Sequence, residues 1–249
     1  MRVVVSSLSV GDWWADTGRV NELPGLTGAD GVELILEGSH QPSRLDPDRL
    51  TVDVESVHAP FADVNLATPS DHHREYALDV LRRSVELARD LGARYVVMHP
   101  GHLTPVTVGD RDLALDLCIE ALREARRIVR NEGLVPAVEN MPDHELLLGS
   151  SPEEIAEIVR ASGCRFALDI GHALTCEGSP LPYLEELKPC VIHVHDNAGD
   201  RDEHRPPGEG ILRERELGEA LEAGELPVIE VKSVEGARRG VALVRRLLG

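Results

Sequence analysis

Residues 191–210 read VIHVHDNAGDRDEHRPPGEG, an apolar run that gives way to three histidines and several acidic residues. The continuous apolar start is typical of a strand that is buried on both faces. The side chains that follow are of the kinds that bind metal ions, and carboxylates are costly to bury unless they are paired or metal-bound. The ends of the other apolar runs therefore bear on the same chemistry.

Short apolar runs recur along the whole chain, and amphipathic segments separate most of them. The expected strands are residues 3–6, 31–36, 52–58, 95–99, 135–139, 166–169, 191–195 and 228–231. The clearest expected helices are residues 71–91, 111–131 and 151–161, and weaker ones are 183–187, 214–223 and 235–248. Ser70 can cap the first helix and Gly92 can end it, whereas Ser151 followed by proline starts the third.

Buried strands that alternate with helices predict a parallel sheet covered on both faces. Eight such units within 249 residues fit a (β/α)8 TIM barrel, with residues 1–249 as one domain. An open, doubly wound sheet is the alternative.

Composition narrows the function classes. Hydrophobic residues make up 42% of the chain and aromatic residues only 3%, so Val, Leu, Ile and Ala must build the core. The net charge of −18 disfavours a nucleic-acid partner unless a local basic patch overrides it. No apolar run approaches the ~20 residues of a membrane helix, so we expect no membrane partner and a cytoplasmic location. The sequence leaves the oligomeric state open.

Most of the expected strands carry a metal-ligand side chain at or just past the end. These residues are His58, His99, Glu139, Asp169, His193 and Glu230, with His172 and His195 close behind. In a barrel the carboxyl ends of the strands meet at one mouth, where the active sites of such barrels lie. Imidazole and carboxylate without thiolate suit Zn²⁺, Mn²⁺, Fe²⁺ or Co²⁺. The pattern therefore predicts divalent cations in the mouth.

The motifs at these strand ends are VHAP, HPG, VEN, LDIGHA, HVHDN, DEHxxxGEG and IEV, between residues 31 and 233. Together they resemble the xylose isomerase-like TIM-barrel superfamily, which includes sugar and sugar-phosphate isomerases and epimerases and also endonuclease IV. The resemblance to the endonuclease IV branch implies nine ligands for three zinc ions. His58, His99 and Glu139 match the first metal; Glu139, Asp169, His193 and Glu230 the second; His172, Asp202 and His204 the third.

The resemblance to the isomerase and epimerase branch implies a smaller site. There Glu139, Asp169, His193 and Glu230 resemble the ligands of a single metal, and the two glutamates flank the substrate. The expected cofactor is thus a divalent metal, Zn²⁺ or Mn²⁺ first, with one to three ions.

Four further residues are candidates for contacts with the substrate. His195 lies two residues after His193 and faces the same side of a strand. Trp13 can stack on a sugar face, His102 lies just past the mouth, and Arg205 beside the GEG turn can bind a phosphate. We also expect Asp196 to orient a metal-binding imidazole.

The interpretation that fits these features best is a metal-dependent isomerase or epimerase of a small carbohydrate or sugar phosphate. Glu139 and Glu230 would be its catalytic pair, moving protons between adjacent carbons. The alternative is an endonuclease IV-like, zinc-dependent phosphodiesterase acting at abasic DNA, which the acidity and the lack of a basic loop disfavour. The run GVELILEG, with Glu33 or Glu37, resembles the sugar-enzyme branch. A non-catalytic metal- or sugar-binding barrel is a third reading.

Overall fold

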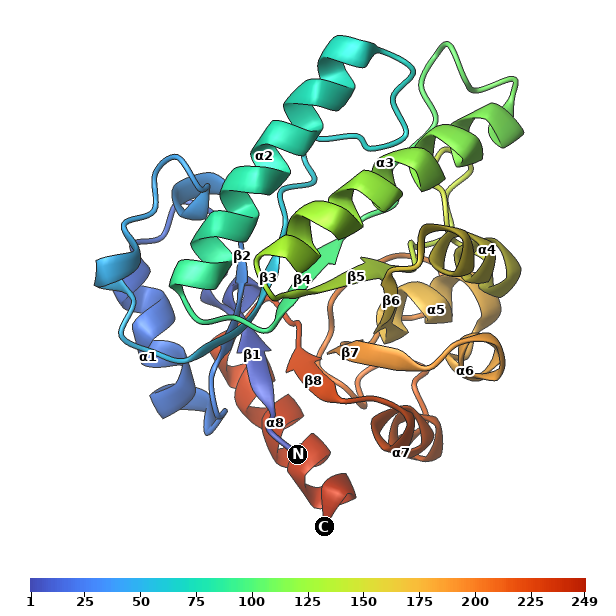
Figure 1. Cartoon of the computed structure of the whole chain (residues 1–249). Helices are drawn as coiled ribbons and strands as arrows, with labels where there is room; N and C mark the ends of the chain where they lie inside the picture. Colours follow the sequence, from blue (N-terminus) through green and yellow to red (C-terminus); the bar gives the residue numbers. More distant parts are fainter.

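A computed structural model describes all 249 residues, and its eight parallel strands close into one barrel in chain order (Figure 1). The strands are β1 (Val4–Ser6), β2 (Val32–Ile35), β3 (Val54–His58), β4 (Tyr95–Met98), β5 (Val135–Glu139), β6 (Arg165–Asp169), β7 (Pro189–Val194) and β8 (Leu226–Ile229). β8 pairs with β1, which completes the ring. The predicted TIM barrel is confirmed, and the open sheet is excluded.

Helices surround the barrel (Figure 1). They are α1 (Thr17–Thr27), α2 (Asp71–Asp90), α3 (Arg111–Asn131), α4 (Pro152–Ser162), α5 (Ile170–Glu177), α6 (Leu181–Glu186), α7 (Glu214–Ala223) and α8 (Val234–Leu248). The expected caps are present, because the Ser70 and Ser151 side chains accept backbone N–H groups of the first turns of α2 and α4. None of the helices combines the length and the apolar character needed to cross a bilayer.

The sequence did not predict two of the helices, α1 and α5. Helix α1 contains Pro24 and two glycines and has only a weak apolar stripe, so its periodicity is faint. Helix α5 has only eight residues and starts directly after β6, where Asp169 is both the last strand residue and the N-cap. The Asp169 side chain accepts the N–H of His172 at 2.7 Å. A strand and a helix that share a residue leave no turn for sequence analysis to detect.

The inner face of the barrel changes from apolar to polar along the strands. Its lower part is a small cluster that includes Val97, Ala137, Ala167, Val191 and Val228. Alternate residues of a strand share a face, so the residues two positions further on also point inward. Those residues are His99, Glu139, Asp169, His193 and Glu230. The outward-facing residues pack under the helices in one large core cluster.

Candidate active site

His193 on β7 lies at the centre of the polar layer and has no exposed surface. Its Nδ1 atom is 2.8 Å from Glu139, 3.1 Å from Glu230 and 3.7 Å from Asp169. Its Nε2 atom is 2.9 Å from Glu33 on β2. Four carboxylates, from β2, β5, β6 and the residue after β8, therefore meet around one imidazole.

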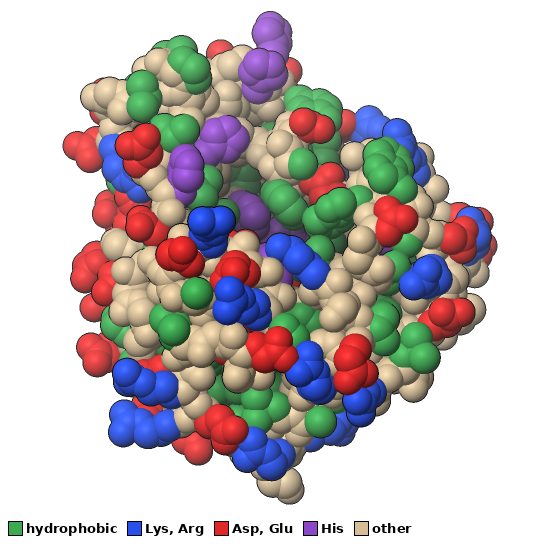
Figure 2. All heavy atoms as spheres, turned by 180° about the vertical axis from the view of Figure 1, so that it is seen from behind, with side chains coloured by type: hydrophobic (Ala, Val, Ile, Leu, Met, Phe, Trp, Pro, Cys, Tyr) green, Lys and Arg blue, Asp and Glu red, His purple; other side chains and the backbone are tan.

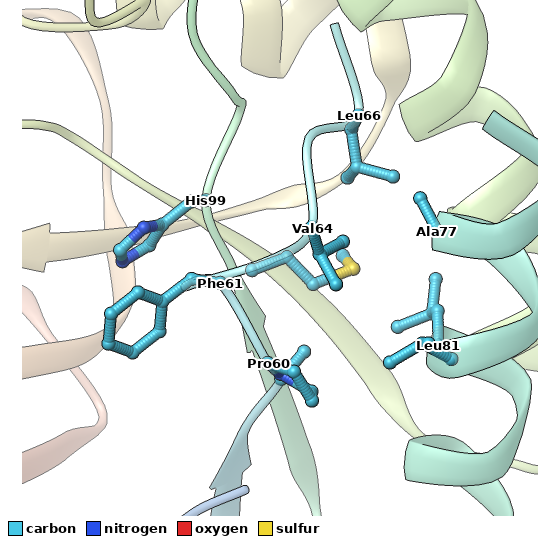
Figure 3. Close-up of a pocket in the computed structure, with 10 residues that line it drawn as sticks. Pro60, Phe61, Val64, Leu66, Ala77, Leu81 and His99 are labelled. Atoms are coloured by element: carbon cyan, nitrogen blue, oxygen red, sulfur yellow. The ribbon is translucent and has the colours of Figure 1, made fainter. Parts of the chain in front are cut away.

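A second group adjoins it on the far side of Glu139. The Nε2 atoms of His58 and His99 lie 3.0 and 3.2 Å from Glu139 Oε2. The ring of Phe61 stacks on His99 at 4.8 Å between centroids and meets His58 edge-on at 5.2 Å. Phe61 belongs to the loop that follows β3. Figure 3 shows the Phe61 and His99 rings side by side, at one end of an apolar pocket between this loop and α2. Glu37 holds the loop because its carboxylate accepts the N–H of Phe61 at 2.8 Å.

A third group forms where the loop after β7 crosses the mouth. Asp202 lies 3.0 Å from His204 Nε2, 3.6 Å from His172 Nε2 and 3.8 Å from His195 Nε2. His195 also contacts Asp169 at 3.0 Å, and its ring stacks on His204 at 4.1 Å. His204 has a φ of +53°, the only positive φ outside glycine. Such a backbone is strained for a histidine, and strain of this kind concentrates at functional sites.

Backbone carbonyls fix the orientation of three of these rings. The Nδ1 atoms of His58, His172 and His204 lie 2.9, 2.8 and 3.0 Å from the carbonyl oxygens of Ala59, Asn140 and Glu230. A carbonyl only accepts, so each Nδ1 carries the hydrogen and each neutral ring keeps its Nε2 lone pair for the cluster.

Burial and charge act against each other on the carboxyl groups. Burial raises the pKa of Glu139, but the charge and hydrogen bond of His193 outweigh it, and the pKa ends well below its ordinary value. The pKa values of Asp169 and Asp202 are lowered in the same way, mainly by His172. Glu230 is the exception, because burial outweighs His193 and His204 and its pKa is raised.

The imidazoles respond to the same balance. Burial lowers the pKa of His193 and of His172, but the surrounding carboxylates raise both well above the ordinary value. Burial dominates at His99, whose pKa is lowered. Positive charge beside the buried carboxylates, here on His172 and His193, therefore stabilises their ionised form.

The residues present fit a divalent cation. Four sets of donor atoms lie mutually within 4.8 Å: His58, His99, Glu139; Asp169, His172, His195; His195, His204, Glu230; and Glu139, Asp169, His193, Glu230. Two buried atoms of the third group, Asp202 Oδ1 and His195 Nδ1, have no hydrogen-bond partner. Buried polar atoms are normally satisfied, so these atoms indicate a ligand. The cysteines belong to none of the sets, and nitrogen and oxygen donors suit Zn²⁺ or Mn²⁺.

The structure thus brings all nine predicted ligand residues together, whereas three of the four predicted substrate contacts lie outside the clusters. Trp13 is 44% exposed and lines a cavity of about 190 Å³ together with Lys232. The His102 side chain is exposed. Arg205 pairs with Glu203 at 2.7 Å. His195, the fourth, is fully buried against Asp169. Their contacts with a substrate stay predictions.

The predicted role of Asp196 was wrong. Its Oδ1 atom accepts the backbone N–H groups of Asn197 and Leu212, and its Oδ2 atom accepts those of Gly208 and Gly210. Asp196 therefore fastens the loop that carries the third group, and it orients no imidazole. Glycine is required at position 210, because a Cβ there would lie 2.0 Å from a carbonyl oxygen.

Sequence reasoning also missed the role of Asn140. Its side chain donates to the Asp169 carbonyl at 3.0 Å and accepts the Asp169 N–H at 2.8 Å, so it ties the end of β6 to β5. Its position directly after Glu139 was the available signal. Phe61, whose ring covers two imidazoles, carried no signal beyond the usual burial of phenylalanine.

On the face opposite that of Figure 1, the surface is hollowed and histidine atoms lie in the hollow, with hydrophobic, basic and acidic side chains around it (Figure 2). The pattern of the family described as "Xylose isomerase-like TIM barrel" matches residues 26–247. The chain belongs to this family.

Relatives from two branches resemble this member of the xylose isomerase-like family. A crystal structure of a D-tagatose 3-epimerase-like protein superposes with a TM-score of 0.88 and 28% identity, covering 100% of this chain and 97% of the other. An uncharacterised protein of Methanocaldococcus jannaschii is 32% identical over 88% of this chain and 80% of its own length. A probable endonuclease 4 of Mycobacterium ulcerans is 27% identical over 77% of this chain and 78% of its own.

Proposed function

We propose that the protein is a divalent-metal-dependent epimerase or isomerase of a sugar or sugar phosphate, which moves a proton between the faces of one carbon or between adjacent carbons. The observation that carries the proposal is the meeting of Glu139 and Glu230 at His193 Nδ1, with Asp169 beside them, at the mouth of the barrel. The structural likeness to a D-tagatose 3-epimerase-like protein over the whole chain supports it.

A cation held by Glu139, Asp169, His193 and Glu230 would polarise a substrate carbonyl as a Lewis acid. The two glutamates provide the proton transfers. In the absence of a cation the pKa of Glu139 is lowered and that of Glu230 is raised, which favours Glu139 as the base and Glu230 as the acid.

In the proposed reaction Glu139 takes the proton from the carbon next to the carbonyl, and the electron pair of the C–H bond passes into the carbonyl group. Glu230, which is protonated at the start, then gives its proton to the opposite face of that carbon, which yields the epimer. Delivery of a proton to the former carbonyl carbon, together with transfer of the neighbouring hydroxyl proton to the former carbonyl oxygen, yields the isomer instead. In the reverse direction the two residues exchange roles.

Other residues shape the proposed substrate site. Phe61 covers His58 and His99 and keeps water from that side of Glu139. We assign to Trp13 the stacking on the sugar ring and to Arg205 the binding of a phosphate, if the substrate carries one. His195 and His102 are proposed as further polar contacts.

The test is solvent-proton exchange. The protein is loaded with Mn²⁺ or Zn²⁺ and incubated in D₂O with D-tagatose, other ketoses and their phosphates, and NMR follows deuterium at the carbons beside the carbonyl. We expect exchange with at least one substrate, and a loss of about 10²–10⁴-fold in Glu230→Gln. Asp200→Asn, in an exposed loop position, is the control. Absence of exchange throughout the panel would reject the proposal.

An endonuclease IV-like phosphodiesterase is the second candidate. The observation in its favour is the third group of Asp202, His172 and His204, which a one-metal epimerase does not need. The similarity to a probable endonuclease 4 points the same way. Cleavage of an abasic oligonucleotide at low salt by the zinc-loaded protein, lost in Asp202→Asn, would favour this candidate over the epimerase.

A further inference from the structure

Glu33 is buried inside the barrel with no exposed surface and no lysine or arginine beside it. It is the middle of the run GVELI, where an apolar residue would fill the barrel equally well. Its Oε2 atom accepts the Ser56 hydroxyl at 2.7 Å, and its Oε1 atom lies 2.9 Å from His193 Nε2. Neither Oε1 nor Nε2 has a hydrogen-bond partner, because their 2.9 Å contact is an ion pair that lacks hydrogen-bond geometry. A buried carboxylate without a function would destabilise the fold.

His193 is oriented opposite to His58, His172 and His204. Those three rings are fixed at Nδ1 by backbone carbonyls and turn Nε2 to the cluster. His193 turns Nδ1 to the cluster, where it meets Glu139 and Glu230, so its Nε2 must be the fixed atom. The group that faces Nε2 is a side chain, Glu33, in place of a backbone carbonyl.

We propose that Glu33 is a positioning residue for the cation site: it holds the hydrogen of His193 on Nε2 and so keeps the Nδ1 lone pair directed at the metal. The inference rests on the proposed cation at Glu139, Asp169, His193 and Glu230. A carboxylate behind a metal-binding imidazole fixes the tautomer and the ring plane and makes the imidazole a stronger ligand. Ser56 acts on the other oxygen of Glu33 and keeps the carboxylate from rotating away.

The test is the affinity of the metal-free protein for Co²⁺, followed by its visible absorption, with no substrate present. We expect Glu33→Gln to weaken binding by about 10–100-fold, the usual cost of losing such a carboxylate. Ser56→Ala keeps the charge and loosens its position, so its loss should be smaller, about 3–10-fold on the same basis. The spectrum of the bound Co²⁺ should also change in Glu33→Gln, since the His193 ring is free to turn.

The matched control is Glu216→Gln, which alters another buried glutamate on α7, outside the barrel and paired with Arg213. It should leave Co²⁺ affinity unchanged. Nitrogen-15 NMR of labelled imidazoles, recorded at a pH high enough to leave His193 neutral, gives a direct readout: the metal-free wild type should show hydrogen on Nε2 of His193, and Glu33→Gln should show a mixture of both tautomers. A merely structural glutamate would alter thermal stability and leave the tautomer alone.

The outcomes are distinct. Co²⁺ affinity of Glu33→Gln within about threefold of wild type, or a His193 tautomer that does not change, would overturn the inference. Such a result leaves the proposed epimerisation intact, because the cation would still bind. Conversely, a wild type whose Co²⁺ affinity depends on Glu33 as expected but which exchanges no substrate proton would refute the proposed function alone.

Discussion

Asp196→Asn should release the loop that carries Asp202 and His204. The aspartate accepts four backbone N–H groups, two on each oxygen, at 2.9–3.0 Å. An asparagine keeps one oxygen, so two of the four bonds are lost and an NH₂ group is placed against two N–H donors. The side chain is completely buried, so no water replaces the lost acceptor.

The size of the effect follows from this count. A hydrogen bond to a charged partner contributes about 1.5–3 kcal/mol, so the loss of two costs about 3–6 kcal/mol. That is a large part of the total stability of about 5–15 kcal/mol that is usual for a folded domain. Because a surface loop can open without unfolding the barrel, part of the cost should appear as local opening.

Two measurements separate these contributions. Urea unfolding followed by circular dichroism reports the global loss, and trypsin cleavage after Arg201 and Arg213, whose side chains are 81% and 80% exposed, reports loop opening. Asp200→Asn alters an exposed aspartate of the same loop whose one ion pair is with Arg201 at 3.9 Å, and it should behave as wild type. The reasoning fails if Asp196→Asn stays within about 1 kcal/mol of wild type and is cleaved at the same rate.

Three further predictions concern the clusters. With a chelator present, thermal unfolding should show the highest stability at about pH 5–6. Carboxylates with lowered pKa values, such as Glu139, stabilise the fold above their unfolded pKa of 4.5, and this stabilisation is lost as pH falls. His172 and His193, with raised pKa values, stabilise the fold below their unfolded pKa of 6.5, and this stabilisation is lost as pH rises. Metal-loaded protein should instead gain stability between pH 6 and 8, since ligands must be deprotonated. His193→Ala should lose bound metal by elemental analysis and keep its far-ultraviolet circular dichroism; full metal content would point to His195 as the ligand. Glu139→Gln should lower metal content as much as His193→Ala does, because the Glu139 carboxylate lies within 3.2 Å of three imidazoles; unchanged content would exclude it as a ligand.

The barrel and the convergence of its strand ends could be predicted because both depend on local periodicity. Alternation within a strand places His193 two residues after Val191 on the same face, whatever the loops do. The expected strand bounds therefore all lie within two residues of those observed. Helix α1 was missed because Pro24 and glycines weaken its pattern.

The hydrogen-bond partners of the site could not be predicted in the same way. The four partners of Asp196 are set by the path of the loop to Leu212, which no local pattern encodes. In the sequence, Glu33 stood out only as part of the run GVELILEG, which resembles the sugar-enzyme branch. Its contact with His193 spans the barrel interior between β2 and β7, so no local pattern encodes it. The cover that Phe61 places over His99 also depends on how one loop folds back. Periodicity thus located the site, and tertiary contacts decide how it is held.

The donors of the cluster around Glu139 come from β3 through β8, from His58 to Glu230. No fragment that lacks either β3 or the end of β8 can therefore assemble it, and during synthesis on the ribosome the last carboxylate emerges only when nearly the whole chain has been made. Until β8 inserts between β7 and β1, the acidic side chains still face water and carry little electrostatic penalty. Ring closure is thus the step at which their charge must be neutralised, so cation uptake and the final stage of folding should be a single kinetic event.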